Sequence, residues 1–529
     1  QKLSWRPSDR NKRPRTSRRL LLTAMSQPVD SDREEISEWP PRDTGKGSSS
    51  DESEDGESAR HVCEEKGEGR GQKFIRQVSL PGAGPNKKRA KLCENDEDVW
   101  EDSEPAAQAS LARWWRREGI NAVKEPLPNS SNPNTRLLHV ARTKEARIFL
   151  KSEICRLKHK LRTTIGLEKA GILSSLASYY DMMGEYQDAE TCLHQSLSLN
   201  QSSKHTQWLL AKVKKQLDAI DIQAEVTKSV AGKEKEDLLF PSPMPVERVS
   251  GNSLSADKFF KKYSSTSTPV VITDVVEDMT HSQWTIEYLR AMIGHKEAPV
   301  KRVVHGSAEW AQLETARAMK VSDFIDSLDE HNTQKLYLFD WSLPIHCTEL
   351  SKELTVPKYF CHDILKKTRE GSLYRDSWPS LFIAPSGLSG GLHVDAFGSN
   401  FWMALFQGRK RWLFFQKEDL PLLYPCYNHS TDPTFDVDVF NPDLQKYPLL
   451  SQTHPRECIL QPGELLFVPA GCPHRVENLD KSLAVSGNFV DESNFHIVKQ
   501  ELRINALKDP RALDLLQQFS DSDSLTNLP

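Results

Sequence analysis

The sequence predicts a mainly β fold whose strands enclose a ligand cavity, with flanking helices, preceded by a small α-helical region and a charged arm. Three observations lead to this prediction. Residues 393–489 hold short apolar and aromatic runs broken by Gly and Pro, which is typical of strands separated by turns. Two segments of this stretch, GGLHVD and PGELLFVPAGCPH, place His and Asp at strand ends. A third segment, GRKRW, places a lysine within a strand.

The first two segments supply a candidate metal centre. His393 and Asp395 are two residues apart in an expected strand, so their side chains should share a face. His474 follows a tight turn at the end of the expected strand 465–468. Two imidazoles and one carboxylate can occupy one face of an octahedral Fe(II) and leave three positions open, as an oxygenase needs for O2 and a chelating cosubstrate. We therefore expect these residues to be the metal ligands and the catalytic centre.

A lysine and a polar strand face indicate a ligand pocket beside this centre. Residues 407–409 are expected to be the turn of a hairpin, after which Lys410, Trp412 and Phe414 share one face. A lysine on the inner wall of a barrel needs an anion to offset its desolvation. The strand 482–489 should also have two unlike faces. Its small and polar face comprises Ser482, Ala484, Ser486 and Asn488, and its packing face comprises Leu483, Val485 and Phe489.

Together these segments resemble a JmjC domain, an Fe(II)- and 2-oxoglutarate-dependent oxygenase of the cupin superfold, which is a double-stranded β-helix. The similarity is strongest to the small JmjC hydroxylase branch that includes the phosphatidylserine-receptor-like lysyl hydroxylase. The upstream segments KLYLFD and VPKYF also resemble that branch. The resemblance covers roughly residues 245–500, less than half of the chain.

The resemblance implies a role for each residue of the site. It implies three iron ligands: His393, Asp395 and His474. It places the distal carboxylate of 2-oxoglutarate on Lys410, with the hydroxyl groups of Tyr337 and Ser486 as partners. Ser486 stands where the lysyl hydroxylase has a threonine.

Met403 departs from the pattern of that branch. It stands where the lysyl hydroxylase has an asparagine that contacts the cosubstrate, and a thioether cannot replace an amide. We hypothesise that Asn400 supplies the amide contact to the cosubstrate instead. Regular alternation would place Asn400 opposite to Met403, so the hypothesis requires a bulge beside Gly398.

The activity that the resemblance implies is hydroxylation of a protein side chain, with 2-oxoglutarate and O2 converted to succinate and CO2. If the attacked carbon is an N-methyl group, the product decomposes to formaldehyde and a free amine, so demethylation is the same chemistry. Hydroxylation is favoured because the chain shows no zinc module that reads chromatin. The alternative is a catalytically idle scaffold that binds partner proteins, against which the complete ligand set argues.

Composition narrows the class of protein further. The chain has 529 residues and a net charge of −4, so there is no global preference for nucleic acid or acidic lipid. Direct nucleic-acid binding stays open. The nine cysteines are scattered without a CxxC pair, which argues against zinc fingers and favours a reducing compartment. No run of about 18 apolar residues occurs, so no transmembrane helix and no membrane partner are expected.

The first part of the chain predicts a nuclear protein. Residues 1–105 are charged and poor in apolar residues, so we expect a disordered arm. Within it, PNKKRAKL holds Lys87, Lys88 and Arg89, a short basic cluster typical of nuclear import. A merely solvated charge run is an equal alternative, and the cytoplasm stays open as a second location. The expected partner is a protein substrate.

The rest of the chain divides into further regions. We expect a linker with a short helix over 106–135, a helical region resembling a tetratricopeptide repeat over 136–220, and a linker over 221–245. The JmjC domain should then cover 246–500 and a C-terminal helix and tail 501–529. One repeat cannot bury both of its faces, so packing of the helical region on another domain is favoured over a peptide groove.

Overall fold

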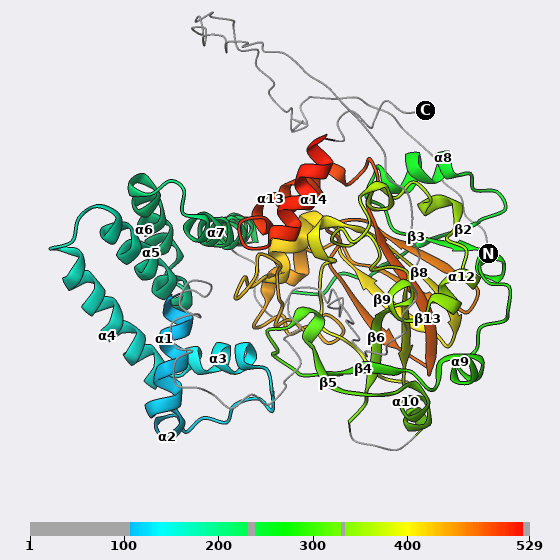
Figure 1. The fold of residues 1–529 in the computed structure, drawn as a ribbon, viewed down its shortest axis with the longest axis horizontal. Coiled ribbons are helices and arrows are strands. Elements are labelled where there is room, and N and C mark those ends of the chain that lie inside the picture. The colour runs from blue at the N-terminus through cyan, green and yellow to red at the C-terminus, as the bar shows by residue number, and fades with distance from the viewer. Residues whose placement is uncertain (1–105, 231–237, 330–333, 522–529) are drawn as a thin grey trace, which may run out of the picture. The chain divides into compact units, whose positions relative to one another are not determined.

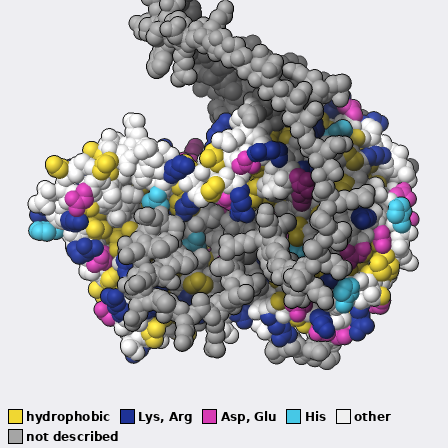
Figure 2. Space-filling view, viewed as in Figure 1, with side chains coloured by type: hydrophobic (Ala, Val, Ile, Leu, Met, Phe, Trp, Pro, Cys, Tyr) yellow, Lys and Arg dark blue, Asp and Glu magenta, His cyan; other side chains and the backbone are white. Residues whose placement is uncertain are grey.

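The computed structural model describes residues 106–230, 238–329 and 334–521. The expected arm, with its PNKKRAKL segment, lies outside the described residues. Where described residues are visible in Figure 2, basic and acidic side chains are interspersed, as the small net charge suggests. Among the described helices, none is both long enough and apolar enough to cross a membrane.

Helices come first in the described chain (Figure 1). Their bounds are α1 Ala106–Trp114, α2 Ile120–Ala122, α3 Pro133–Arg142, α4 Lys144–Leu161, α5 Gly166–Met183, α6 Tyr186–Leu199 and α7 Lys204–Val230. Gly184 ends α5 with a left-handed φ of 79°, which only a residue without a side chain adopts readily. Trp114 stacks on Phe149 with ring centroids 5.3 Å apart, so the expected short helix docks within the chain. The tetratricopeptide resemblance stays a prediction.

Helix α7 corrects one expected boundary. It continues to Val230, so the first part of the segment expected as a linker over 221–245 is helical. The side chain of Gln223 donates a hydrogen bond at 2.8 Å to Pro421 O, in the short 3-10 helix Lys417–Leu423 of the β part. A tertiary contact therefore supports a segment whose charged sequence alone favoured a linker.

Two sheets form the β part. The nine-stranded sheet has the order β2-β3-β11-β8-β13-β7-β6-β4-β5, and the four-stranded sheet has the order β1-β10-β9-β12. The strands are β1 Met244–Pro245, β2 Glu247–Ser250, β3 Val270–Thr273, β4 Glu297–Val303, β5 Leu313–Lys320, β6 Tyr337–Ser342, β7 Ser380–Ala384, β8 Asn400–Gln407, β9 Lys410–Phe414, β10 Arg456–Leu460, β11 Leu465–Val468, β12 His474–Asn478 and β13 Ser482–Phe489. From β8 to β13 the chain passes repeatedly between the two sheets, which confirms the expected mainly β architecture.

Shorter helices flank these sheets. They are α8 Ala256–Phe259, α9 Ile286–Ile293, α10 Val321–Asp326, α11 Leu343–His346, α12 Thr348–Glu353, α13 Phe495–Asn505 and α14 Pro510–Asp521. Ser255 caps α8, since its Oγ accepts a hydrogen bond from the Lys258 amide at 3.2 Å. The flanking helices agree with the fold that the sequence predicts.

Two local expectations about the strands are wrong. Residues 407–409 do not form a hairpin, because β8 pairs with β11 and β13 while β9 pairs with β10 and β12. The turn carries the chain from one sheet to the other, and Gly408 permits this with a φ of 77°. The segment around His393 is not a strand either, since its only ladder contact is a single bridge to His474. Turn residues in a sequence indicate a change of chain direction, but they do not determine which strand the next strand pairs with.

Buried side chains lie on both faces of the large sheet. One face packs into an apolar core that includes Trp402, Val485 and Phe489. The other face, toward the four-stranded sheet, includes Phe401, Met403, Ala484 and, from the opposite sheet, Trp412 and Phe414. The expected division of the 482–489 strand into two unlike faces is therefore confirmed. The space between the two sheets is where the candidate site lies.

Candidate active site

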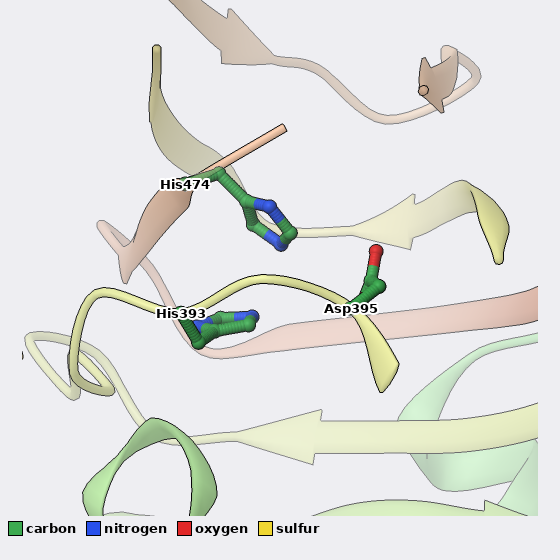
Figure 3. Close-up of side chains that lie close together, drawn as sticks. All are labelled: His393, Asp395 and His474. Carbon is green, nitrogen blue, oxygen red and sulfur yellow. The ribbon is translucent and has the colours of Figure 1, made fainter. Parts of the chain in front are cut away.

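His393, Asp395 and His474 meet in the space between the sheets (Figure 3). Their potential ligand atoms all lie within 4.8 Å of one another. The bridge between His393 and His474 holds the two segments together, with amide-to-carbonyl hydrogen bonds of 3.0 and 2.8 Å. All three side chains are buried. The structure therefore brings together the three residues that the sequence singled out.

The two imidazoles are oriented by backbone carbonyl groups. His393 Nδ1 donates to Gly391 O at 2.9 Å, and His474 Nδ1 donates to Cys472 O at 3.0 Å. A carbonyl oxygen can only accept, so each Nε2 keeps its lone pair for a metal. Burial lowers the pKa of His393 well below its usual value and the pKa of His474 to about 4, which favours the neutral form that metals bind.

The carboxylate of the cluster lies in an acidic surrounding. Burial, and then the nearby Asp340 carboxylate, raise the pKa of Asp395 to about 7, while a hydrogen bond from Asn488 acts in the opposite direction. Two carboxylates near each other in a buried site favour a bound cation. Neutral imidazoles, an acidic carboxyl pair and atoms at this separation fit a divalent metal such as Fe(II).

Cys472, which lies near His474 in the sequence, is not arranged as a ligand. Its Sγ donates a hydrogen bond to Phe415 O at 3.0 Å. Burial raises the pKa of the thiol far above its usual range. A neutral buried thiol is a packing group.

Lys410 lies fully buried in the same cavity. Its Nζ donates to Asn478 Oδ1 at 2.6 Å and is 3.4 Å from the hydroxyl of Tyr337. These recorded partners are neutral, and burial lowers the pKa of Lys410 to about 7. Ser486 Oγ is also buried and has no hydrogen-bond partner among the described residues. A bound carboxylate would satisfy these groups, so the residues fit 2-oxoglutarate.

One cavity, partly open to solvent, contains both groups of residues. Its walls carry the three candidate ligands together with Lys410 and Tyr337. Met403 also lines it, at the position where the sequence departs from the family pattern. The three candidate metal ligands and the Lys410 ammonium group thus line the same cavity.

The Asn400 hypothesis is not supported by where the structure places this residue. Its amide nitrogen donates to Asp491 Oδ1 and Ser493 Oγ, and its oxygen accepts from the Ala470 amide at 2.9 Å. Strand β8 pairs with β13 in regular register from Asn400 to Leu405, and the register shift of this pairing lies at its other end, between Leu483 and Ala484, so no bulge turns the Asn400 side chain inward. Asn400 is therefore on the opposite face to Met403 and is not carried into the proposed site.

Other residues of the cavity were missed from the sequence. Asn478 could have been found, because it lies four residues after His474 on the same face of β12. Asn488 lies on the polar face of β13 that the sequence identified. Trp310 packs against the His393 ring at a centroid distance of 4.3 Å. Asp340, whose own φ is 51°, also lines the cavity. Sequence periodicity carries no signal for these last two positions.

Comparison with known proteins agrees with this geometry. Residues 256–495 match the family model of the cupin-like domain. Lysine-specific demethylase 8 of Xenopus tropicalis is 32% identical over 236 residues, which are 44% of this chain and 50% of that protein. The bifunctional arginine demethylase and lysyl-hydroxylase psr-1 of Caenorhabditis elegans is 26% identical over 262 residues, 48% of this chain and 63% of that protein.

A third relative is the 2-oxoglutarate and iron-dependent oxygenase JMJD4 of Mus musculus, 31% identical over 189 residues, 34% of this chain and 43% of that protein. The chain thus spans between 43% and 63% of the length of these relatives. The matches confirm the family resemblance found in the sequence. Residues 256–495 of this chain are therefore similar to cupin-like domains of the JmjC kind.

Proposed function

We propose that this protein is an Fe(II)- and 2-oxoglutarate-dependent oxygenase that hydroxylates a protein side chain. One observation carries the proposal: a single cavity holds two neutral imidazoles and a carboxylate at one place and a buried ammonium with neutral partners at another. A metal fits the first group and a carboxylate the second. The names of the relatives include an iron- and 2-oxoglutarate-dependent oxygenase and a lysyl-hydroxylase, which supports the same chemistry.

Each residue then has a defined task. His393, Asp395 and His474 would hold Fe(II), and Lys410 would bind the distal carboxylate of 2-oxoglutarate with help from Tyr337 and Ser486. When bound, iron and 2-oxoglutarate supply the activation of O2 and the oxidation of a C–H bond. Gly391 and Cys472 fix the imidazoles through their carbonyl groups. Aromatic side chains, among them Trp310, Phe382 and Trp412, line the reacting space.

The cavity wall favours a basic substrate side chain. Asp340 adds a second carboxylate beside Asp395, and the rings of Trp310 and Phe339 stand next to it in the wall. Carboxylates and aromatic faces both attract ammonium and guanidinium groups. Lysine and arginine are also the residues named for the relatives. We infer a lysine or arginine side chain as substrate, hydroxylated directly or demethylated by the same chemistry.

The test is succinate formation. Purified protein is incubated aerobically with Fe(II), 2-oxoglutarate and peptides that carry lysine or arginine, each plain or N-methylated. Succinate is measured by NMR, and peptide products by mass spectrometry. A gain of one oxygen indicates hydroxylation, and loss of a methyl group with formaldehyde indicates demethylation. Succinate formation no greater than that of His393→Ala would leave the idle scaffold as the better description.

We infer a nuclear location from the basic cluster and from the demethylase relatives. The substitution of Lys87, Lys88 and Arg89 by Ala should move a tagged full-length protein toward the cytoplasm. Microscopy of the tagged variants measures this. A distribution that stays nuclear after this triple substitution, with residues 5–19 also deleted, contradicts the assignment of these segments.

A further inference from the structure

A buried carboxylate joins the helical region to the β part. Glu314, at the start of β5, is 3% exposed. It accepts hydrogen bonds from Ser130 Oγ at 2.6 and 2.8 Å, from Thr135 Oγ1 at 3.0 Å and from Ser307 Oγ at 2.8 Å. The three hydroxyl residues are each at most 5% exposed. Hydrogen bonds to a charged acceptor in a buried place are stronger than neutral ones, so this network fixes both segments.

The helical region also contacts the segment before Glu314 at three further points. The side-chain amide of Asn132 donates to the Glu309 carboxylate. The hydroxyl of Thr135 accepts from the Ala308 amide at 3.0 Å. His139 Nε2 hydrogen-bonds with Gly306 O at 2.9 Å. Residues 306–314 are thus held along their length by residues 130–139.

The held segment contains a turn with an uncommon backbone. Ala311 and Gln312 have φ values of 52° and 57°, in the left-handed region that residues with side chains rarely adopt. Such a conformation persists only where the surroundings impose it. The Ala311 carbonyl accepts from the Gly391 amide at 2.7 Å. A Cβ on Gly391 would lie 2.8 Å from Gln312 Cγ, so the turn and residue 391 fit closely together.

This turn determines the surroundings of His393. The carbonyl of Gly391 accepts from His393 Nδ1 at 2.9 Å, which sets the tautomer. The Trp310 ring meets the imidazole edge-on at 4.3 Å, and its Nε1 donates to Val394 O at 2.8 Å. The orientation of the imidazole therefore depends on where the turn lies, and the turn is anchored at Glu314.

We propose that Glu314 is a positioning residue for the metal site, through which residues 130–135, before and at the start of helix α3, hold His393 in its ligating orientation. The proposal rests on the proposed function, because it takes His393 as a metal ligand. Residues 130–135 lie outside the segment that matches the cupin-like domain. The metal affinity of that domain thus depends on a part of the chain that the family match does not include.

The test measures metal affinity separately from stability. Full-length protein is stripped of metal and titrated under nitrogen with Co(II), which takes the same ligands as Fe(II), in competition with a chromophoric chelator. Loss of a group that orients a ligand from the outer shell weakens metal binding by about 10- to 100-fold. We expect Glu314→Ala to weaken Co(II) binding about tenfold, and Glu314→Gln to restore part of the loss because one acceptor oxygen remains.

Glu353 provides a matched control. Its carboxylate accepts from Trp284 Nε1 at 3.2 Å and from the Tyr288 hydroxyl at 2.9 Å, and none of these three residues lines the cavity. Glu353→Ala should lower the melting temperature but leave the Co(II) affinity within about twofold of wild type. Equal losses of affinity in Glu314→Ala and Glu353→Ala would overturn the proposal, as would a folded Glu314→Ala with wild-type affinity.

A milder variant decides the matter if Glu314→Ala does not fold. Thr135→Val removes one hydroxyl from the helical side at nearly constant volume. It should weaken Co(II) binding about threefold, the factor expected for one lost hydrogen bond, and unchanged binding would overturn the proposal. A wild-type protein that binds no Co(II) would instead refute the metal site itself, and with it the proposed function.

Discussion

Strand β13 buries side chains on both of its faces. Apolar side chains pack together on one face, whereas polar groups on and beside the other face lack hydrogen-bonding or charged partners. The outward face carries Leu483, Val485 and Phe489, which pack into an apolar core. The inward face carries Ser482, Ala484 and Ser486, beside the buried Lys410. Burial of apolar area stabilises a fold by itself, whereas burial of an ammonium or a lone hydroxyl costs free energy until a partner is present. The outward face is stable without a ligand, whereas the polar groups on the inward side find their partners only when ligands bind.

The largest expected effect sets Asp395→Ala against Val485→Ala. Loss of one metal ligand should reduce succinate formation to about a hundredth of the wild-type rate or less. Val485→Ala should cost about 1–3 kcal/mol of unfolding free energy through a small cavity, with turnover kept below the melting temperature. Succinate assays and thermal melts of both variants measure this. Wild-type turnover by Asp395→Ala would contradict the ligand assignment.

The next largest effect concerns the buried ammonium. Lys410→Met keeps most of the length of the side chain and removes its charge. The concentration of 2-oxoglutarate at half-maximal rate should rise about 10- to 100-fold, because a charge-assisted bond to the carboxylate is lost. The ligand-free variant should be at least as stable as wild type, since an ammonium with neutral partners is no longer buried. An unchanged half-saturation would remove Lys410 from the cosubstrate site.

The sequence predicted the features that depend on local alternation. The faces of β9 and β13 follow from a period of two residues. They place Lys410 and Trp412 in the cavity wall, and Ser486 directly opposite Met403 of that wall, as expected. The proximity of His393 and His474 was also expected, because both were predicted to bind the same metal. It is made by a single bridge and not by the strand that was expected around His393.

The features that the sequence could not supply depend on distant contacts. The pairing partners of β8 and β9 are decided by which strands fill each sheet, so the expected hairpin was wrong. Asn400 was placed inward by assuming a bulge, but its amide finds Asp491 and Ser493 on the other face. Asp340 and Ala311 take positive φ values that their neighbours impose, and periodicity contains no sign of them.

A pH dependence should distinguish the two faces further. Burial lowers the pKa of Lys410 from 10.5 to about 7, so between these values the folded ligand-free protein binds fewer protons than the unfolded chain. Its stability should therefore rise with pH across this window. The carboxylate of 2-oxoglutarate favours the charged lysine, so binding above pH 7 must take up a proton.

Affinity for 2-oxoglutarate should accordingly fall with rising pH, by up to about tenfold for each unit above pH 7. Calorimetric titrations with saturating Co(II), at several pH values and in two buffers of different ionisation enthalpy, measure both affinity and proton uptake. Val485→Ala should keep the wild-type dependence, and Lys410→Met should lose it. A dependence that survives in Lys410→Met would assign the titration to another group.

The smallest expected effect compares two polar side chains that β strands direct to opposite faces. Ser486 Oγ lacks a partner among the described residues, whereas Asn400 makes hydrogen bonds to Asp491, Ser493 and Ala470. Ser486→Ala should raise the half-saturation for 2-oxoglutarate about threefold, since one neutral hydrogen bond to the carboxylate is lost. It should not destabilise the ligand-free protein, because no protein partner is left unsatisfied.

Asn400→Ala should behave in the opposite way. It leaves the Ala470 amide without its partner and removes one of the donors to the Asp491 carboxylate, which costs about 1–3 kcal/mol of unfolding free energy. The half-saturation for 2-oxoglutarate should stay at the wild-type value, because the side chain points away from the cavity. Melting curves give the stability of each variant, and rate measurements give its half-saturation for 2-oxoglutarate. If Asn400→Ala raised the half-saturation while Ser486→Ala did not, the assignment of inward and outward faces around the cosubstrate would have to be reversed.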